Sequence, residues 1–440
     1  MQAVGSPDQW DTGVAGGMTT RMASEKPAGM ADWPEAGTGA KARMEVPDSE
    51  SILRSVEQVR AAGISCVEII AWRDADDPEA GGSEMHAHRV ASEWAGAGLD
   101  VVMRTSRAPG RAELEWRNDY RVVRRSGRYW VFPRTFLELS TGIGYPAEAD
   151  AVVEVWNGMP FLGPLATRKP HVTILHHVHA KMWNMVLPPM LAWMGRTVEL
   201  KLAPKAYRSS RIITLSESSR GEIASTLGIP VQHIRVVPPG VDPGFSPGRT
   251  KAPYPLVIAV GRLVPVKRFD RLIESLAAVK QEIPDLKAII VGEGYERPKL
   301  ESIRALYGAD GWIRMPGRLS DAALVDIYRS AWMVVSTSSK EGWGMTVTEA
   351  GACGTPAVVT DIVGHRDAVI HGVSGLLVPA SESLPQVIKR VIQDEVLRET
   401  LSVGAHKYAR TLTWKATATA ILDELVAAAQ QRRASGLSRK

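Results

Sequence analysis

Apolar and polar residues alternate along this 440-residue chain in two recurring patterns. Short apolar runs rich in valine and isoleucine, such as 66–71 and 255–260, predict buried strands. Stretches with apolar residues at helical spacing lie between them, for example at 268–283. Strands that alternate with helices are typical of parallel sheets covered by helices on both faces. The pattern therefore predicts an α/β protein.

One proline-rich stretch interrupts this alternation. Residues 243–255 contain four prolines and two glycines, which indicate a linker. A single core stops growing near ~250–300 residues, so a chain of this length is expected to form two domains. We predict a disordered leader at 1–48, rich in Gly, Ala, Pro and Met, and an N-terminal Rossmann-like domain at 49–245 that opens with a helix at 49–62. A C-terminal Rossmann-like domain at 246–411, a terminal helix at 412–431 and a basic tail at 432–440 follow.

Composition narrows the class of protein. Hydrophobic residues make up 45% and charged residues 23%, and the net charge is +5, from 53 basic and 48 acidic residues. That balance does not indicate a nucleic-acid partner. Cys66 and Cys353 lie in apolar or small-residue context and are expected to be reduced, buried thiols. No apolar run reaches ~18 residues and no signal peptide is recognisable, so we expect a cytoplasmic protein, or one peripheral to a membrane.

The stretch at 340–349, K-E-G-W-G-M-T-V-T-E, carries the most chemistry. It follows an apolar run at 333–338 and precedes a small-residue helix, so it is predicted to be a glycine-flanked turn at a helix start. Such a start favours an anion, because its free N–H groups and the helix dipole point positive charge outward. Glu341 and Glu349 could accept hydrogen bonds from the vicinal hydroxyls of a sugar and a ribose.

This stretch resembles the donor-sugar motif of retaining glycosyltransferases of family 4. Other patterns of that family follow in the expected order: G-G-S-E-x-H at 81–86, G-R-L-x-x-x-K at 261–267, V-G-x-G at 291–294 and G-R-L-S at 317–320. The resemblance covers about 66–430. It implies the GT-B fold, in which two doubly wound Rossmann-like domains face each other across a cleft and a C-terminal cross-over helix returns to the first domain.

The resemblance also implies an activity and a set of site residues. The activity is transfer of a sugar, a hexose in the first instance, from a nucleoside diphosphate sugar to a hydroxyl acceptor, with retention of configuration. No metal and no other cofactor is implied, because protein cations and helix ends neutralise the diphosphate. The implied catalytic residues are His176, Glu341, Arg262 and Lys267, and the implied substrate-binding residues are Gly82, Arg318, Trp343, Gly344, Met345, Thr346 and Glu349.

Some positions depart from the family pattern or leave a choice open. Pro239 stands where the hinge motif P-N-G-V-D has asparagine, and G-H-R-D at 364–367 replaces the common G-x-P-E. The second departure leaves the sugar contact of that loop open. His176 matches the histidine beside the donor sugar best, with His177 as the alternative.

Four further features have a simpler interpretation beside the functional one. D-A-D at 74–76 matches a metal signature of another glycosyltransferase fold, but a solvated acidic loop is the preferred interpretation. The three histidines at 176–179 are not expected to bind metal, since a strand end points alternate side chains to opposite faces. Nine arginines at 104–134 are interpreted as solvated rather than as an anionic binding face. The apolar run at 182–194 predicts core packing, with a lipid acceptor or a membrane surface as the alternative.

Two rival functions share the implied fold, although an epimerase would be expected to lack the combination of G-R-L-x-x-x-K with E-G-x-G. A nucleotide-sugar 2-epimerase would act without an acceptor, and a catalytically inactive relative would only bind the nucleotide sugar. The acceptor class, whether glycan, lipid or small metabolite, is open at this stage, as is a peripheral contact with the inner surface of a membrane.

Overall fold

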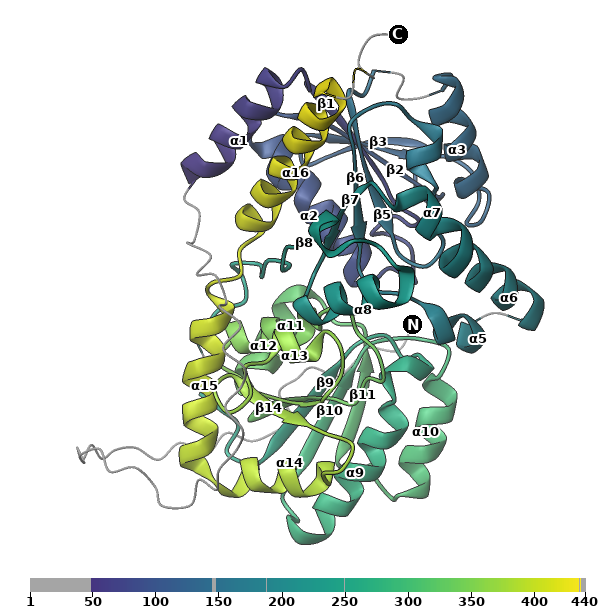
Figure 1. Ribbon diagram of the computed structural model, residues 1–440. Coiled ribbons are helices and arrows are strands. Elements are labelled where there is room, and N and C mark those ends of the chain that lie inside the picture. Colours follow the sequence, from purple (N-terminus) through teal and green to yellow (C-terminus); the bar gives the residue numbers. More distant parts are fainter. Residues whose placement is uncertain (1–48, 145–147, 187, 249, 435, 437–440) are drawn as a thin grey trace. The chain divides into compact units, whose positions relative to one another are not determined.

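The computed structural model describes residues 49–144, 148–186, 188–248, 250–434 and 436. The predicted leader at 1–48 and the last residues of the predicted tail, 437–440, lie outside these ranges. The described chain carries two separate β-sheets, each covered by helices (Figure 1). We refer to the parts around them as the N-terminal half and the C-terminal half.

The N-terminal half is built on an eight-stranded sheet with the order β3-β4-β2-β1-β5-β6-β7-β8. Every neighbouring pair is parallel except β3 and β4, which form an antiparallel edge. Its strands are β1 (Cys66–Ile70), β2 (Asp100–Thr105), β3 (Leu114–Arg117), β4 (Tyr120–Arg124), β5 (Ala151–Trp156), β6 (His171–Leu175), β7 (Arg211–Thr214) and β8 (Ile234–Val236).

The C-terminal half is built on a six-stranded sheet with the order β11-β10-β9-β12-β13-β14, in which all neighbours are parallel. Parallel strands are buried on both faces, which explains why they appear in the sequence as short, nearly continuous apolar runs. These strands are β9 (Leu256–Val260), β10 (Lys287–Val291), β11 (Ile313–Gly317), β12 (Met333–Ser336), β13 (Ala357–Thr360) and β14 (Gly375–Val378).

Helices connect the strands and cover both sheets. In the N-terminal half they are α1 (Ser49–Ala61), α2 (Gly82–Gly96), α3 (Val131–Thr141), α4 (Gly163–Ala166), η1 (Ala180–Met182), α5 (Trp183–Val186), α6 (Pro189–Thr197), the π-helix η2 (Val198–Leu202), α7 (Ala203–Tyr207), α8 (Glu217–Leu227) and η3 (Val231–His233). After the linker they are η4 (Pro265–Lys267), α9 (Phe269–Glu282), α10 (Arg297–Leu306), α11 (Asp321–Ser330), α12 (Met345–Ala352), α13 (His365–Ala368), α14 (Leu384–Gln393), α15 (Glu395–Ala409) and α16 (Trp414–Ala434).

Helix α16 follows the C-terminal half in the chain but packs on the N-terminal half. α16 packs beside α1 and α2 (Figure 1), and Ala418, Ile421, Leu422 and Leu425 are buried in the same apolar core as the residues of β1. Trp94 of α2 donates its indole N–H to the carbonyl of Ala418 at 3.0 Å. The cross-over helix predicted from the sequence is therefore present.

Each sheet has one point at which the strand order reverses direction. In the N-terminal sheet β1 has β2 on one side and β5 on the other, and in the C-terminal sheet β9 has β10 on one side and β12 on the other. Ligands of open α/β sheets bind in the crevice outside the carboxyl ends of the strands at such a point. The motifs at 81–86, 261–267 and 337–349 all follow strands that border these two points.

The arginine-rich stretch differs from the prediction. Residues 104–134 form the end of β2, the β3–β4 hairpin and the start of α3, and the arginines are not simply solvated. Arg104 and Arg124 are buried, because each pairs with a carboxylate: Arg104 with Glu68, and Arg124 with Asp74 at 3.0 Å. Buried charges are tolerated when they are paired in this way.

Cys66 and Cys353 are both buried free thiols, as predicted, and burial raises the pKa of each to about 11. None of the helices in the described part of the chain combines the length and the apolar character that crossing a bilayer requires.

Candidate functional site

Two loops of the C-terminal half are joined side by side at the reversal point between β9 and β12. The hydroxyl of Thr337, just after β12, lies 3.0 Å from the carbonyl oxygen of Lys267 and 2.9 Å from that of Arg268. The amide of Ser339 donates to the carbonyl of Val266 at 2.8 Å. These bonds hold the loop that carries Lys267 against the loop that carries Glu341.

The side chains of these two loops form an ion pair. The ammonium group of Lys267 donates to Oε1 of Glu341, and the hydroxyl of Ser338 donates to the same oxygen at 2.7 Å. Burial opposes ionisation of Glu341, but the charge of Lys267 and the hydrogen bonds from Lys267 and Ser338 outweigh it. The pKa of Glu341 therefore lies below its ordinary value, and the carboxylate is charged at neutral pH.

Glycines bring a third loop into contact with the first. A Cβ atom on Gly292 would lie 1.9 Å from the carbonyl oxygen of Gly261, and one on Gly294 would lie 2.2 Å from that of Leu263. Neither position can hold a side chain, which gives a physical reason for V-G-x-G after β10. The loop with Arg262 is thus fixed from two sides.

The loop after β1 in the N-terminal half meets the cations of the C-terminal half. Nη1 of Arg262 donates to the carbonyl of Glu79 at 3.2 Å, and Nη2 of Arg318 donates to the carbonyl of Pro78 at 2.8 Å. A Cβ atom on Gly81 would lie 3.2 Å from Nε of Arg262. The two guanidinium groups therefore lie beside the loop that leads into α2.

The amino end of α2 is capped by a residue of its own first turn. The carboxylate of Glu84 accepts a hydrogen bond from the amide of Gly81 at 2.9 Å, as in a capping box. A Cβ atom on Gly82 would lie 3.2 Å from Sδ of Met345, the first residue of α12. The amino ends of α2 and α12 thus come close together, and both can attract an anion.

His176 follows β6 and lies under the turn of the central motif. A Cβ atom on Gly342 would lie 2.6 Å from the carbonyl oxygen of His176, so only glycine fits there. Nε2 of His176 lies 3.2 Å from Nδ1 of His86 on α2. Burial lowers the pKa of His176 to about 4 and holds that of His86 well below its ordinary value, so both rings are neutral at pH 7.

The alternative residue, His177, has a different environment. Its ring stacks on that of His179, with 4.6 Å between the ring centroids. The buried carboxylate of Glu199 organises this loop, since it accepts hydrogen bonds from the amides of His179 (2.7 Å) and Ala180 (2.8 Å) and from the indole N–H of Trp183 (2.9 Å). Glu199 lies in the π-helix η2, and π-bulges are often found at functional sites.

Glu349 lies on the second turn of α12. The hydroxyl of Tyr328 on α11 donates to its Oε2 at 3.2 Å. Burial raises the pKa of Glu349 to about 7, which the hydrogen bond from Tyr328 does not offset. The carboxyl group is therefore poised between its two protonation states near neutral pH, whereas Glu341 is fully charged.

The G-H-R-D loop contacts the N-terminal half. The carboxylate of Asp367 accepts hydrogen bonds from the amides of Glu217 (3.1 Å) and Ser218 (3.2 Å) and from the hydroxyl of Ser218, at the amino end of α8. A carboxylate at a helix amino end is stabilised by the helix dipole. Asp367, the acidic residue of the G-H-R-D loop, therefore binds the N-terminal half of the protein.

The side chain of Trp343 has a packing role. It is buried in an apolar cluster with Leu215 of the N-terminal half, Ala368, and Leu412 just before α16. Trp343, one of the implied substrate-binding residues, thus also joins the two halves. Gly344 has a φ of 106°, which favours glycine, and α12 begins directly after it.

The structure brings most of the predicted site residues into one region. Gly82, Arg262, Lys267, Glu341 and the turn at 342–346 are linked to one another or to His176 by the contacts described above. Arg318 and Glu349 lie at the edge of this region. Arg318 is bound to the carbonyl of Pro78, and Glu349 is bound to the hydroxyl of Tyr328. Three residues without an assigned role in the prediction also lie in this region, His86, Glu199 and Asp367, and all three act through contacts between segments distant in the sequence.

The D-A-D sequence at 74–76 is part of a different network. Asp74 is buried and pairs with Arg124 and Arg117, and Asp76 pairs with Arg117 and with Arg111 at 3.0 Å. The interpretation as a solvated acidic loop was therefore wrong for Asp74. Its charge is neutralised by the same arginines that were expected to be solvated.

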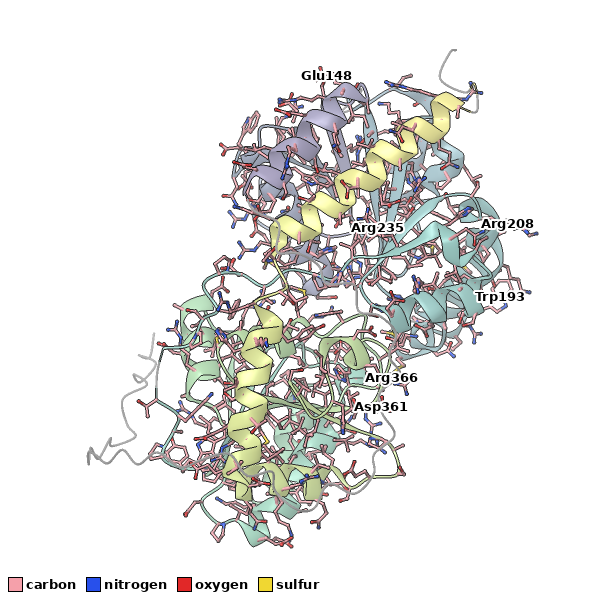
Figure 2. All side chains as sticks on the ribbon, turned by 60° about the vertical axis from the view of Figure 1, so that its left-hand side comes forward. Glu148, Trp193, Arg208, Arg235, Asp361 and Arg366 are labelled. Atoms are coloured by element: carbon pink, nitrogen blue, oxygen red, sulfur yellow. The ribbon has the colours of Figure 1, made fainter. Side chains whose placement is uncertain are left out.

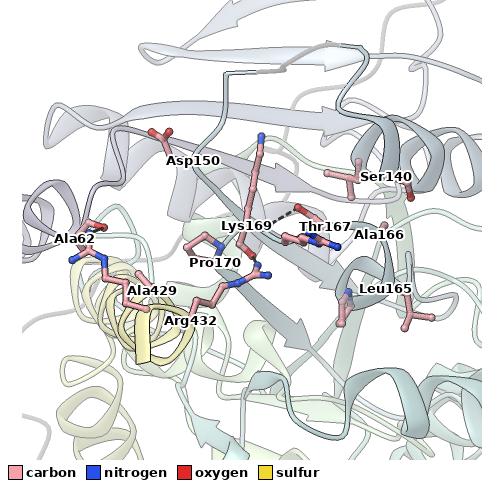
Figure 3. A pocket seen from close by; sticks show the side chains of 14 residues that line it. Ala62, Ser140, Asp150, Leu165, Ala166, Thr167, Lys169, Pro170, Ala429 and Arg432 are labelled. Atoms are coloured by element: carbon pink, nitrogen blue, oxygen red, sulfur yellow. Dashed lines mark hydrogen bonds between the residues drawn. The ribbon is translucent and has the colours of Figure 1, made fainter. Parts of the chain in front are cut away.

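A hollow of about 840 Å³ lies away from the site, at the amino ends of β5 and β6 and beside the end of α16 (Figure 3). Arg168, Lys169, Arg432 and Arg433 contribute to its lining, with Asp150 as the acidic member. None of the predicted site residues lines it. Because ligands of α/β sheets bind at the carboxyl ends of the strands, we place the functional site at the motifs.

Two Rossmann-like sheets, each with its reversal point at the site, and a last helix that returns to the first sheet define the GT-B class of α/β proteins. Residues 80–245 match the family model "Glycosyltransferase Family 4", and residues 246–408 match "Glycosyl transferases group 1". The protein belongs to this glycosyltransferase family.

Curated relatives support this assignment. A D-inositol 3-phosphate glycosyltransferase of Saccharomonospora viridis is 30% identical over 285 residues, which cover 60% of this chain and 66% of the relative. The corresponding protein of Actinosynnema mirum is 30% identical over 284 residues, which cover 59% of this chain and 68% of the relative. For the first of these the chain spans slightly less than two thirds of the relative's length.

Solved structures show the same fold. The sucrose-phosphate synthase of Thermosynechococcus elongatus superposes with a TM-score of 0.70 at 20% identity, over 85% of this chain and all of that one. HepE of Anabaena, solved in complex with UDP-glucose, superposes with a TM-score of 0.65 at 19% identity, over 84% of this chain and 99% of that one. The family and the GT-B fold expected from the sequence are thereby confirmed.

Proposed function

We propose that the protein transfers a sugar from a nucleoside diphosphate sugar to a hydroxyl acceptor, with retention of anomeric configuration. The observation that carries this proposal is the arrangement at the reversal point of the C-terminal sheet. Lys267 binds the carboxylate of Glu341, which directly precedes the glycine turn that opens α12, and Arg262 lies on the same loop as Lys267, beside the start of α2. UDP-glucose in the HepE complex makes a uridine nucleotide and a hexose the first donor to test.

The cations stabilise the departing diphosphate. Negative charge grows on this group as the bond to the sugar breaks, and preorganised positive groups in a site shielded from water lower the barrier most at that stage. In the structure Arg262 binds the carbonyl of Glu79, and Lys267 binds Glu341. A bound diphosphate would take over both cations, and the free amides of Gly344 and Met345 would add to them.

The carboxylates hold hydroxyl groups. Glu341 is ionised and accepts hydrogen bonds from the sugar, and Glu349 accepts them from the ribose diol. Thr346, in the first turn of α12, lies between them in sequence and contributes its hydroxyl. Arg318 lies beside the nucleotide base.

His176 lies against the sugar near the reacting carbon. Because its ring is neutral, it cannot serve as a cation, and it acts as a hydrogen-bond partner whose tautomer is set by His86. Attack then occurs on the face that the diphosphate leaves, with the leaving phosphate as the base for the acceptor hydroxyl. No protein nucleophile and no metal ion is part of this proposal.

The two domains have separate roles in this proposal. We assign acceptor binding to 49–245, donor binding to 246–411 and a return to the first domain to 412–431. The two family models, which adjoin at residues 245 and 246, support this division. A glycan, a lipid or a small metabolite can serve as the acceptor on these grounds, and a peripheral contact with the inner surface of a membrane is part of the proposal.

Thermal unfolding against a panel of nucleoside diphosphates and their sugars tests the donor assignment. A ligand that binds only the folded protein adds roughly 2.7 kcal/mol at ~100 times its dissociation constant. A shift with one base family, abolished in Glu349→Gln, supports the proposal. The absence of a shift with every nucleotide would overturn it.

Product analysis separates the two rival functions. A 2-epimerase would convert the nucleotide sugar into its epimer without an acceptor. An inactive relative would show the thermal shift without any consumption of donor. Release of nucleoside diphosphate that depends on an added acceptor is the result that only a transferase gives.

A further inference from the structure

Helix α6 presents its large apolar side chains to solvent. Met190 is 72% exposed, Trp193 60% and Met194 48%, and these residues share one face of the helix, since they are spaced three and four positions apart. Single exposed apolar residues are normal, but a group of them indicates an interaction site. The core packing predicted for the run at 182–194 is therefore wrong for these three residues, and the alternative stated for that run was contact with a lipid acceptor or a membrane surface.

The orientation of α6 is fixed by its opposite face. Ala192 and Gly195 are the buried residues of this helix, and a Cβ atom on Gly195 would lie 2.8 Å from the ring of Trp183. The small residues therefore pack against Trp183, and Trp183 is itself anchored to the buried carboxylate of Glu199. The helix cannot rotate its apolar face inward without losing this contact.

The surface around α6 is basic. Four cations lie between residues 196 and 208, and Lys201, Lys205 and Arg208 are exposed. The one acidic residue of 183–208, Glu199, is buried and binds the His179 loop, so it does not offset them. Figure 2 shows Trp193 and Arg208 on the same outer edge of the N-terminal half.

We propose that the surface formed by α6 and the segment 196–208 docks onto an anionic lipid bilayer, with Met190, Trp193 and Met194 inserted at the interface and the cations against the head groups. Apolar insertion combined with basic residues is the chemistry by which helices lie in a membrane interface, and an aromatic ring is well suited to that depth. A negatively charged leaflet attracts each nearby lysine and arginine, whereas a protein partner would need specific acids opposite them.

The docked surface would place the site next to the bilayer. Trp183, which supports α6, follows directly after the loop that begins with His176, and Glu199 binds both Trp183 and that loop. On the basis of the proposed function, the acceptor-binding part of the site would thus face the lipids. Docking itself does not depend on that function, so the two can be tested separately.

Flotation of the purified full chain with vesicles tests the proposal. One vesicle preparation consists of phosphatidylcholine alone, and the other contains phosphatidylglycerol as a second component. We expect binding to the anionic vesicles, weakening with added salt, and little binding to the neutral ones. Failure to bind anionic vesicles would overturn the proposal, whatever the outcome of the donor experiments.

Variants identify the surface. Met190→Ser together with Trp193→Ser, and separately Lys201→Glu with Lys205→Glu, should each weaken vesicle binding by about tenfold or more. These side chains are exposed, so the unfolding midpoint should be unchanged. The matched control is Trp116→Ser, which removes a tryptophan that is 67% exposed on the edge strand β3 and should leave binding unchanged.

Three further outcomes would contradict the proposal. Equal binding by the Trp193 variant and the wild type would exclude the surface. Equal loss in Trp116→Ser would show that any exposed tryptophan suffices. A wild-type dimer that becomes a monomer in Met190→Ser with Trp193→Ser, without vesicle binding in either, would show that a second copy of this chain covers the surface instead.

Discussion

The rings of His86 and His176 meet edge to face, with Nδ1 of the first 3.2 Å from Nε2 of the second. Both rings are neutral, so one nitrogen must donate and the other accept, and the pair fixes both tautomers. The ring of Trp414, at the start of α16, lies 5.6 Å from that of His86, centroid to centroid. The helix that returns from the C-terminal half thus helps to seat the histidine pair.

This relationship predicts a positioning role for His86. We expect His86→Ala to lower kcat by about tenfold with little change in the Kd of the nucleotide sugar. The substitution no longer fixes the tautomer of His176, but it removes no contact to the nucleotide sugar. His86→Asn, which keeps a hydrogen-bonding group near the position of Nδ1, should recover most of kcat. Steady-state kinetics with donor titration measures both.

A control on the same helix separates this role from stability. His88, two residues along, is also buried but binds Tyr120 and the amide of Ala75. His88→Gln should reduce the unfolding midpoint without the loss in kcat. If His86→Asn were as slow as His86→Ala, positioning through the hydrogen bond would be refuted.

The Lys267–Glu341 pair predicts a coupled loss of activity. Lys267→Ala should lower turnover by tenfold or more, which corresponds to ~1.4 kcal/mol or above in the barrier. Glu341→Gln should lower it as well, and the double variant should lose less than the sum, because each partner holds the other. Lys299→Ala, at an exposed lysine paired with Glu296, serves as the control and should keep wild-type turnover. Additive losses would show that the two residues act independently.

Glu349 predicts a dependence of stability on pH. Burial raises its pKa to about 7, whereas an unfolded glutamate titrates near 4.5. The folded protein therefore binds more protons than the unfolded chain between these values, and this group's contribution to stability is full below pH 4.5 and is lost as the pH rises to about 7. Chemical denaturation of Glu349→Gln should show a free energy of unfolding that falls less over this window than that of the wild type.

The same substitution should act in the opposite direction on function. Glu349→Gln removes the charge that is expected to hold the ribose diol, so turnover should fall tenfold or more, ~1.4 kcal/mol in the barrier, even where the folded protein is stabilised. Turnover at the wild-type level at low donor concentration would contradict this role. An unchanged pH dependence of stability would contradict the buried environment of the carboxyl group.

The close contact between Gly342 and the backbone of His176 predicts that a single added methyl group lowers both stability and turnover. Its Cβ would lie 2.6 Å from the carbonyl oxygen of His176, a backbone atom that cannot move aside without shifting the loop. Gly342→Ala should cost about 1–3 kcal/mol of stability and reduce turnover, because the central turn and the His176 loop separate. Gly221→Ala in α8, where no atom lies within 4 Å of the new Cβ, should leave turnover unchanged and raise stability slightly. Wild-type turnover in Gly342→Ala would show that the two loops need not touch.

The sequence predicted the C-terminal half well because its signals are local. The apolar runs, the glycine turns and the N-cap of α11 at Ser320 all lie within a few residues of the features they determine. Likewise, G-R-L-x-x-x-K and E-G-W-G each follow a strand directly. Which strands lie side by side then follows from the topology of doubly wound sheets.

Several features could not be predicted, most of them because they depend on contacts between distant segments. His86 and His176 are 90 residues apart, and Asp367 lies 149 residues from Ser218. For the apolar face of α6 core packing was preferred over contact with a lipid acceptor or a membrane surface, since periodicity shows that a helix has an apolar side but not whether that side points inward. The buried arginines were predicted to be solvated, because a carboxylate partner 36 residues away in the sequence, as for Arg104 and Glu68, leaves no local signal.

The packing of α16 also bears on the order in which the protein is made. The core of the N-terminal half includes residues 418–429, which are synthesised after the strands and helices of the C-terminal half. The C-terminal half, by contrast, has its own apolar core within residues 257–401, and can complete it earlier. During synthesis the N-terminal half therefore emerges with α1 and α2 uncovered until α16 has been made, and the growing chain depends on protection of that face until then.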